Sequence, residues 1–147
     1  MYKCKHFGIK ELVSKIVFTK YGETFCWKFF DEAILRDLDT IREFHNKAII
    51  INNWATGGSF SQCGFRSNMD PMVKAKNTLY CSAHCMGKAF DLHSSDVKKL
   101  YKDVQTLYNL GKLHAIQRME SPNSTKYGWC HVDSFQKTCK GLEIFTA

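Results

Sequence analysis

Residues 82–91 read Ser82-Ala83-His84-Cys85-Met86-Gly87-Lys88-Ala89-Phe90-Asp91. An imidazole precedes a glycine in this stretch, a carboxylate follows it, and residues 88–92 have the composition of a strand. Glycine permits a sharp backbone turn. We therefore expect Gly87 to fold His84 back beside Asp91, with Ala89 leaving room next to both.

A second stretch, Trp129-Cys130-His131-Val132-Asp133, has the alternation of a strand. Alternation places Trp129, His131 and Asp133 on one face and the intervening residues on the other. Two imidazoles and one carboxylate form the ligand set of a catalytic zinc ion that keeps one position open for water. We predict that His84, Asp91 and His131 bind Zn²⁺. A structural site built on cysteine thiolates is the alternative, but Cys130 falls on the opposite strand face.

The first stretch matches the pattern S-x-H-x-x-G-x-A-x-D, and it resembles the signature of zinc peptidases that cut bacterial cell-wall stem peptides. That family includes D-alanyl-D-alanine carboxypeptidases and dipeptidases and phage L-alanyl-D-glutamate endopeptidases, and the hedgehog signalling domain is a relative. The second stretch resembles the hydrophobic-x-His-x-Asp strand of one branch. Weaker likenesses lie in residues 6–13, 30–54 and 57–67, so that the resemblance covers roughly residues 6–135.

The resemblance implies a zinc metallopeptidase, a hydrolase acting on peptidoglycan stem peptides, and it also implies roles for three further residues. Arg66 aligns with an arginine that faces the substrate, where a guanidinium can clamp a carboxylate or stabilise an oxyanion. Ser82 corresponds to a hydrogen-bond donor to the substrate peptide. Trp129 is expected to form a wall of the substrate pocket.

The general base cannot be carried over from the resemblance, because many members have an acid three residues before the second histidine and this chain has Gly128 there. We expect a hairpin of residues 113–120 and 127–135, closed by a turn at 121–126. That register sets His114 opposite Asp133 and places Glu120 about four residues, or ~13 Å, from His131. It favours Asp133 as the base or as a residue that orients a ligand, followed by His114 and then Glu120.

The remaining elements predict an α+β domain with a small, mainly antiparallel sheet and helices packed on one side, like the hedgehog and DD-peptidase folds. Apolar residues at helical spacing predict a short helix over residues 9–16, a longer one from Asp31 to about Asn46, and another from Ser94 or Ser95 to Gly111. Residues 48–51 read as a buried strand. Residues 53–80 read as a long loop, which in a compact domain is usually functional.

Length and composition fit one domain over residues 1–147, since 147 residues with 44% hydrophobic content can bury a core. The formal charge of +7 suits an anionic partner such as the carboxylates of a cell wall. The basic residues are dispersed and form no nucleic-acid motif, so we do not expect nucleic-acid binding. Seven cysteines, an odd number, are expected to be mostly reduced thiols.

No apolar run is long enough to span a membrane, and the first residues lack the apolar core of a signal peptide. We therefore expect a monomer that is made in the cytoplasm and acts on the cell wall after release, as a phage endolysin or a virion component. Two rival functions remain. One is a non-catalytic, zinc-bound binding domain of the same fold, favoured by Gly128. The other is a basic nucleic-acid-binding protein, whose affinity would depend strongly on salt.

Overall fold

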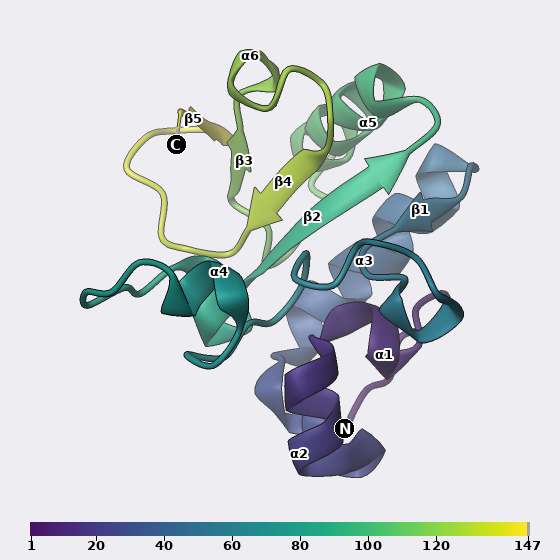
Figure 1. The fold of residues 1–147 in the computed structure, drawn as a ribbon. Coiled ribbons are helices and arrows are strands. Elements are labelled where there is room, and N and C mark those ends of the chain that lie inside the picture. Colours follow the sequence, from purple (N-terminus) through teal and green to yellow (C-terminus); the bar gives the residue numbers. More distant parts are fainter. Residues whose placement is uncertain (147) are drawn as a thin grey trace.

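The centre of the fold is a mixed β-sheet, drawn as arrows in Figure 1. The computed structural model describes residues 1–146, and within them five strands form one sheet in the order β1-β2-β4-β3-β5. The strands are β1 (Ile49–Ile50), β2 (Ala89–Ser94), β3 (Arg118–Glu120), β4 (Cys130–Asp133) and β5 (Glu143–Phe145). All neighbouring pairs are antiparallel except β3 and β5. The predicted α+β class with a mainly antiparallel sheet is confirmed.

Six α-helices and three 3₁₀ turns complete the part of the chain that the structure describes. The helices are α1 (Ile9–Leu12), α2 (Lys15–Cys26), α3 (Glu32–His45), α4 (Pro71–Lys74), α5 (Val97–Asn109) and α6 (Pro122–Thr125). The 3₁₀ turns are η1 (Trp27–Phe29), η2 (Trp54–Thr56) and η3 (Ala83–Met86). None of the helices in residues 1–146 combines the length and the apolar character needed to cross a membrane.

The hydrophobic core lies between one face of the sheet and the two long helices. Phe90 and Leu92 of β2 and Cys130 and Val132 of β4 are completely buried, as strand alternation predicts. Helix α5 packs against β2 and β4, and α3 packs against α5 (Figure 1). Both helices present a buried apolar stripe, and the residues of these stripes are Ile34, Leu35, Leu38, Ile41, Leu100, Val104 and Leu107. This arrangement leaves Asp91 and His131 on the other face of the sheet.

Helices α3 and α5 are close to their predicted bounds. Helix α3 follows Asp31 at its N-cap and ends at Asn46, whose φ of 55° is left-handed. Helix α5 begins later than predicted, because Ser94 belongs to β2 and the Asp96 carboxylate caps the helix by accepting from Lys99 N at 3.0 Å.

The helix predicted over residues 9–16 is interrupted. Helix α1 ends at Leu12, Val13 is extended, and Ser14 starts α2 by accepting from Val17 N with its hydroxyl. The extended residue bridges Phe65, whose backbone N donates to Leu12 O at 2.8 Å. This contact at the break between the two helices therefore anchors the loop of residues 60–66 to the N-terminal part of the chain.

The predicted hairpin register is wrong by four residues. Arg118, and not His114, lies opposite Asp133, and Met119 lies opposite Val132. Residues 113–117 do not extend the strand, because the buried carboxylate of Asp37 accepts from the backbone N of His114, Ala115 and Ile116. The connection is also longer than a turn, since Pro122 begins the helical turn α6.

Candidate metal centre

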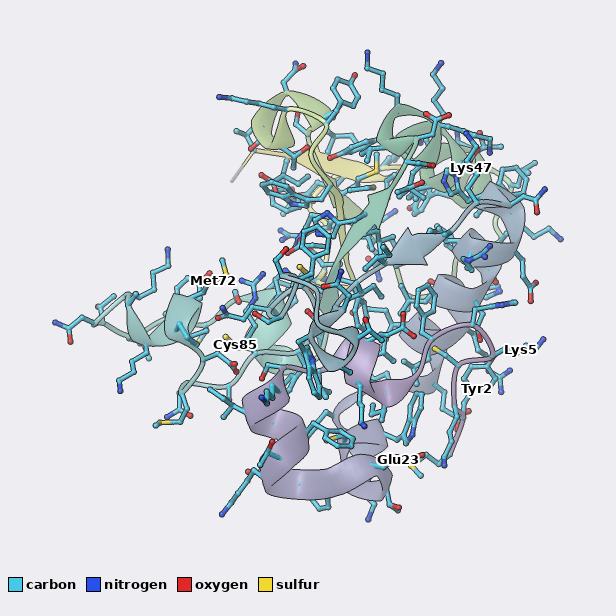
Figure 2. The ribbon with its side chains drawn as sticks, turned by 45° about the vertical axis from the view of Figure 1, so that its right-hand side comes forward. Tyr2, Lys5, Glu23, Lys47, Met72 and Cys85 are labelled. Carbon is cyan, nitrogen blue, oxygen red and sulfur yellow. The ribbon has the colours of Figure 1, made fainter. Side chains whose placement is uncertain are left out.

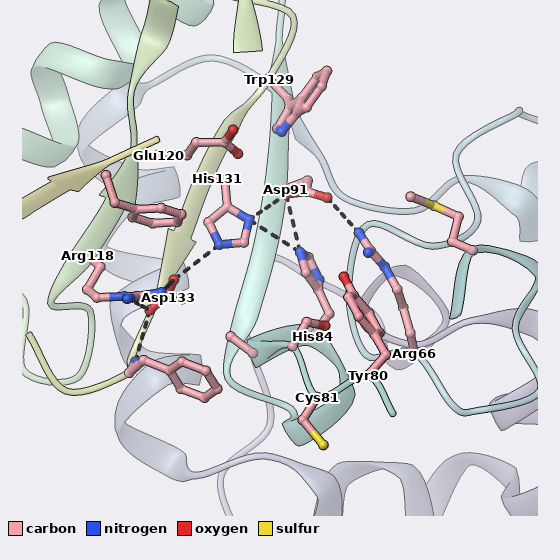
Figure 3. A pocket seen from close by; sticks show the side chains of 15 residues that line it. Arg66, Tyr80, Cys81, His84, Asp91, Arg118, Glu120, Trp129, His131 and Asp133 are labelled. Carbon is pink, nitrogen blue, oxygen red and sulfur yellow. Dashed lines mark hydrogen bonds and ion pairs between the residues drawn. The ribbon is translucent and has the colours of Figure 1, made fainter. Parts of the chain in front are cut away.

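Three ligand atoms converge on the open face of the sheet, as the sequence predicts. His84 comes from η3, Asp91 from β2 and His131 from β4, where His131 is the cross-strand partner of Asp91. Each offers one ligand atom, and the three atoms lie within 4.8 Å of one another (Figure 3). His131 Nδ1 is 2.8 Å from Asp91 Oδ1 and 3.3 Å from His84 Nε2, and His84 Nε2 is 3.4 Å from Asp91 Oδ1.

These separations fit a small tetrahedral metal ion. Bonds of about 2.0–2.1 Å in a tetrahedral site set neighbouring ligand atoms about 3.3–3.4 Å apart. Two of the three separations, 3.3 and 3.4 Å, match the edges of one face of such a tetrahedron, and the third, 2.8 Å, is shorter because His131 and Asp91 are directly hydrogen-bonded. The donor set also suits zinc, because two imidazole nitrogens and one carboxylate oxygen leave one position for water or substrate. The residues therefore fit the ion that the sequence predicts.

The turn before β2 fixes His84 and its tautomer. Gly87 closes η3 with a φ of 68°, and a Cβ there would lie 2.2 Å from Phe29 O, so glycine is required for two reasons. His84 Nδ1 lies 2.9 Å from Gly64 O. A carbonyl oxygen only accepts, so Nδ1 carries the proton and Nε2 presents its lone pair to the cluster. Burial lowers the pKa of His84, which favours this neutral form.

His131 is held between two carboxylates. Its Nδ1 faces Asp91, and its Nε2 lies 3.2 Å from Asp133 Oδ2. Burial lowers the pKa of His131, but the hydrogen bonds with Asp133 and Asp91 outweigh burial and raise it to about 9. When a metal takes Nδ1, Nε2–H still donates to Asp133. A carboxylate behind a metal-binding imidazole fixes the ring and strengthens it as a ligand.

Both carboxylate oxygens of Asp133 accept hydrogen bonds from other residues. Arg118 donates to both of its oxygens, Phe135 N donates to Oδ1 at 2.9 Å, and the residue is 0% exposed. Burial raises the pKa of Asp133, yet the hydrogen bonds from His131 and Arg118 lower it below the usual value. Of the two roles expected for Asp133, this geometry matches orientation of His131.

Arg66 supports the third ligand. Its Nη2 donates to Asp91 Oδ2 at 3.0 Å, which leaves Oδ1 for the cluster, and its Nε donates to Gln62 O. The side chain is nearly buried, with 7% of the residue exposed. Burial raises the pKa of Asp91, but the hydrogen bond from His131 and the proximity of the His84 imidazole hold that pKa well below its usual range. The expected substrate arginine thus orients a ligand, and it also lines the cleft described next.

A cleft of about 450 Å³ opens over the three ligands, and we call it the metal-site cleft. Its lining includes Arg66, Ser82, Trp129 and Glu120 (Figure 3). The β3–β4 register, continued by one residue beyond Met119, sets Glu120 beside His131. Oε1 of Glu120 accepts a hydrogen bond from Ser124 Oγ at 2.6 Å, and this is the one hydrogen bond that the carboxylate makes within residues 1–146. Glu120, ranked last as a base from the sequence, therefore lines the cleft on the strand next to His131.

Of the other candidate residues, Trp129 and Ser82 line this cleft, and His114 lies outside it. Trp129 forms part of the wall, as expected, and the Ser82 hydroxyl lies in the lining but donates to Cys85 Sγ at 3.4 Å. His114 is exposed and lines a separate hollow with Tyr108 and Lys137, so its expected place near Asp133 is wrong. The physical reason is the Asp37 carboxylate, which holds the backbone of residues 114–116 against α3.

Arg118 lines the cleft and holds Asp133, and the sequence analysis did not identify it as a site residue. It shares a face of β3 with Glu120, two residues away, so strand alternation alone would have paired them. The pairing was missed because the expected register set His114, and not Arg118, opposite Asp133. Cys130, by contrast, is buried in the core on the face away from the ligands, as expected. All seven cysteines lie among the described residues, and no disulfide joins them there.

The ligand atoms, the residues that hold them and the cleft above them are all observed in the structure. No protein-family model, curated protein or solved structure matches the chain.

Proposed function

We propose that this protein is a zinc-dependent peptidase that hydrolyses peptide bonds in peptidoglycan stem peptides. The observation that carries the proposal is the convergence of His84, Asp91 and His131 under a cleft that also holds the carboxylate of Glu120. The substrate class rests on the resemblance of residues 82–91 to the signature of cell-wall zinc peptidases. The same resemblance leads us to propose a hedgehog-like and DD-peptidase-like arrangement for the α+β fold.

A zinc ion held by His84, Asp91 and His131 would supply a Lewis acid for the scissile carbonyl and would lower the pKa of water to about 7. The chain supplies the remaining groups. Glu120 takes a proton from the attacking water and returns it to the leaving amine, so that one water molecule is consumed for each peptide bond broken. Trp129 limits the access of solvent from one side of the cleft.

Glu120 replaces Asp133 in our proposal for the base. A general base needs an oxygen that can approach the water, and both oxygens of Asp133 already accept hydrogen bonds from Arg118. Glu120 Oε2 takes part in no hydrogen bond within residues 1–146, and the residue lines the cleft. The base missing at Gly128 is thus supplied from the adjacent strand β3, at the cross-strand position next to His131.

The surface charge is compatible with this substrate. Stem peptides carry carboxylates, and the chain has a formal charge of +7, which increases the rate of encounter with an anionic polymer. The function as a phage endolysin or virion component remains part of the same proposal, because either would bring the protein to the cell wall.

The direct test is digestion of purified cell walls, followed by turbidity and by mass spectrometry of the released muropeptides. We expect about one zinc ion per chain, loss of lysis with a chelator and recovery when zinc is added back. His84→Ala should lose zinc and activity, while His6→Ala is the matched control because His6 is exposed and contacts Glu43 on the surface. Zinc-loaded protein that releases no muropeptide would favour the rival, a non-catalytic binding domain.

A further inference from the structure

A second cleft adjoins the metal-site cleft on the other side of Asp91. It encloses about 250 Å³ and is formed by residues 59–63 together with His93 and Trp129, and we call it the Phe60 cleft. The Phe60 ring stacks on the His93 ring with centroids 3.9 Å apart, and His93 in turn faces the Trp129 ring at 6.5 Å. The walls are therefore aromatic, with serine hydroxyls and the Gln62 side chain among them.

The two clefts share one wall. Arg66, Met72, Asp91 and Trp129 line both of them. Met72 belongs to α4, on the side of the molecule away from Tyr2 and Lys5 (Figure 2). Because Asp91 is one of the three metal ligands, the shared wall lies at the metal site itself. A substrate bound across the ligands thus has room to continue in both directions.

The Phe60 cleft is held in shape by the backbone around it. Cys63 N donates to Asn52 Oδ1 at 2.8 Å, Phe60 N donates to Asn53 Oδ1 at 2.8 Å, and Asp91 N donates to Cys63 O at 2.8 Å. The Cys63 thiol lies 3.4 Å from His93 Nε2, so these two side chains also hold each other in the wall of the cleft.

The charges of the two clefts argue against recognition of a chain end. A guanidinium is the strongest partner for a terminal carboxylate, and in the described part of the chain the arginines that line the clefts are Arg66, in both, and Arg118, in the metal-site cleft alone. Arg66 is committed to Asp91, and Arg118 is committed to Asp133 and lies 3.9 Å from Glu143. Neither guanidinium is free to bind a substrate carboxylate without releasing a ligand or the residue behind it.

We infer that the site is an endopeptidase site, in which the Phe60 cleft binds the uncharged part of the stem peptide on one side of the scissile bond. This inference rests on the proposed function and specifies its substrate as an internal peptide bond. Water adds its hydroxyl to the carbonyl carbon, the C–N bond breaks, and the amine leaves with the proton. No terminal carboxylate is required for this reaction.

The first test compares a synthetic stem pentapeptide with free ends and the same peptide acetylated at its N-terminus and amidated at its C-terminus. We expect zinc-dependent cleavage of both at similar kcat/KM, with product masses that locate an internal bond. If a cation clamped the terminal carboxylate, amidation would lower kcat/KM by about 10- to 100-fold. Such a loss, or release of the last residue alone, would overturn the inference and leave the proposed function standing.

The second test removes the aromatic wall. Phe60→Ala should lower kcat/KM for the blocked pentapeptide about tenfold, the scale of one aromatic contact. The same substitution should change kcat/KM little for shortened peptides that lack the residues bound in the Phe60 cleft. Phe44→Ala is the matched control, because Phe44 is exposed on α3 and lines neither cleft.

The second test can contradict the role of the Phe60 cleft independently of the first test. An unchanged kcat/KM in Phe60→Ala, with zinc content equal to that of the wild type, would overturn the assignment of the Phe60 cleft. Equal losses for long and short peptides would also overturn it, since that pattern indicates damage to the metal site. Wild-type protein that hydrolyses no peptide would overturn the proposed function itself.

Discussion

Arg118 donates two parallel hydrogen bonds to Asp133, from Nε to Oδ1 at 2.9 Å and from Nη2 to Oδ2 at 3.0 Å. The two residues are cross-strand partners in β3 and β4, and a bidentate pair of this kind is both strong and fixed in orientation. Asp133 is therefore held behind the His131 ring, and our proposal assigns the proton transfers to Glu120 instead. This relationship separates the functions of Glu120 and Asp133 and leads to the first prediction.

Glu120→Gln should retain zinc and the fold but lower turnover by about 10²–10⁴-fold, the usual contribution of a positioned acid–base group. The amide keeps the size of the side chain and the hydrogen bond with Ser124, but it cannot take up a proton. Muropeptide release and metal content measured on the same preparation check the prediction. Asp133→Asn is the comparison, and it should reduce zinc affinity instead, because it weakens the support of His131. Full activity in Glu120→Gln would remove Glu120 as the base.

Arg66→Ala should weaken zinc binding about 10- to 100-fold, the scale found when a residue that orients a metal ligand is lost. The reason is the hydrogen bond from Arg66 Nη2 to Asp91 Oδ2, which fixes the carboxylate that faces the two imidazoles. Titration with a zinc-buffered competitor gives the dissociation constant. A variant with unchanged zinc affinity and a raised KM would show instead that Arg66 acts on the substrate, as its alignment implies.

Zinc affinity should rise with pH up to about 9. The pKa of His131 is raised to about 9 in the metal-free protein because hydrogen bonds with Asp133 and Asp91 outweigh the opposing effect of burial. Below that pH a zinc ion must displace a proton from His131, so the apparent affinity falls by about tenfold for each unit of pH. Calorimetry at pH 7 in two buffers with different ionisation enthalpies should show release of about one proton from this residue. Binding that is independent of pH between 7 and 9 would contradict the pairing.

Asp103→Ala should destabilise the fold by about 3–5 kcal/mol, because it leaves a buried ionisable partner unpaired. Asp103 Oδ2 lies 2.6 Å from His45 Nδ1 and also binds Lys99 Nζ, and His45 Nε2 lies 2.8 Å from Ser94 Oγ. The order of these groups is that of a Ser-His-Asp triad, but none of the main clefts in the described chain is lined by them. Urea unfolding measures the loss. A serine-directed phosphonate should not label the protein, and labelling at Ser94 would assign chemistry to this cluster.

The sequence predicted the turn that brings His84 beside Asp91 and the strand face that His131 shares with Asp133, because both depend on local chemistry. Gly87 can turn the chain in only a few ways, and strand alternation decides which side chains of residues 129–133 share a face. Helix α3 and helix α5 could be predicted for the same reason, since an apolar stripe at helical spacing is a property of the segment itself. In each of these cases the residues that decide the structure lie within a few positions of one another.

Only the tertiary structure decided the register between β3 and β4, and the register decides which acidic residue of β3 lies beside His131. Asp37 lies in α3, far from residue 114 in the sequence, yet its buried carboxylate holds residues 114–116 and sets where β3 begins. A shift of four residues moves Glu120 from a remote position to the side of His131 and replaces His114 with Arg118 opposite Asp133. The pairing of Arg66 with Asp91 is likewise a long-range contact, fixed by the anchoring of residues 60–66 to Leu12. Contacts between distant residues depend on how whole elements pack, and the pattern of a single segment does not contain that information.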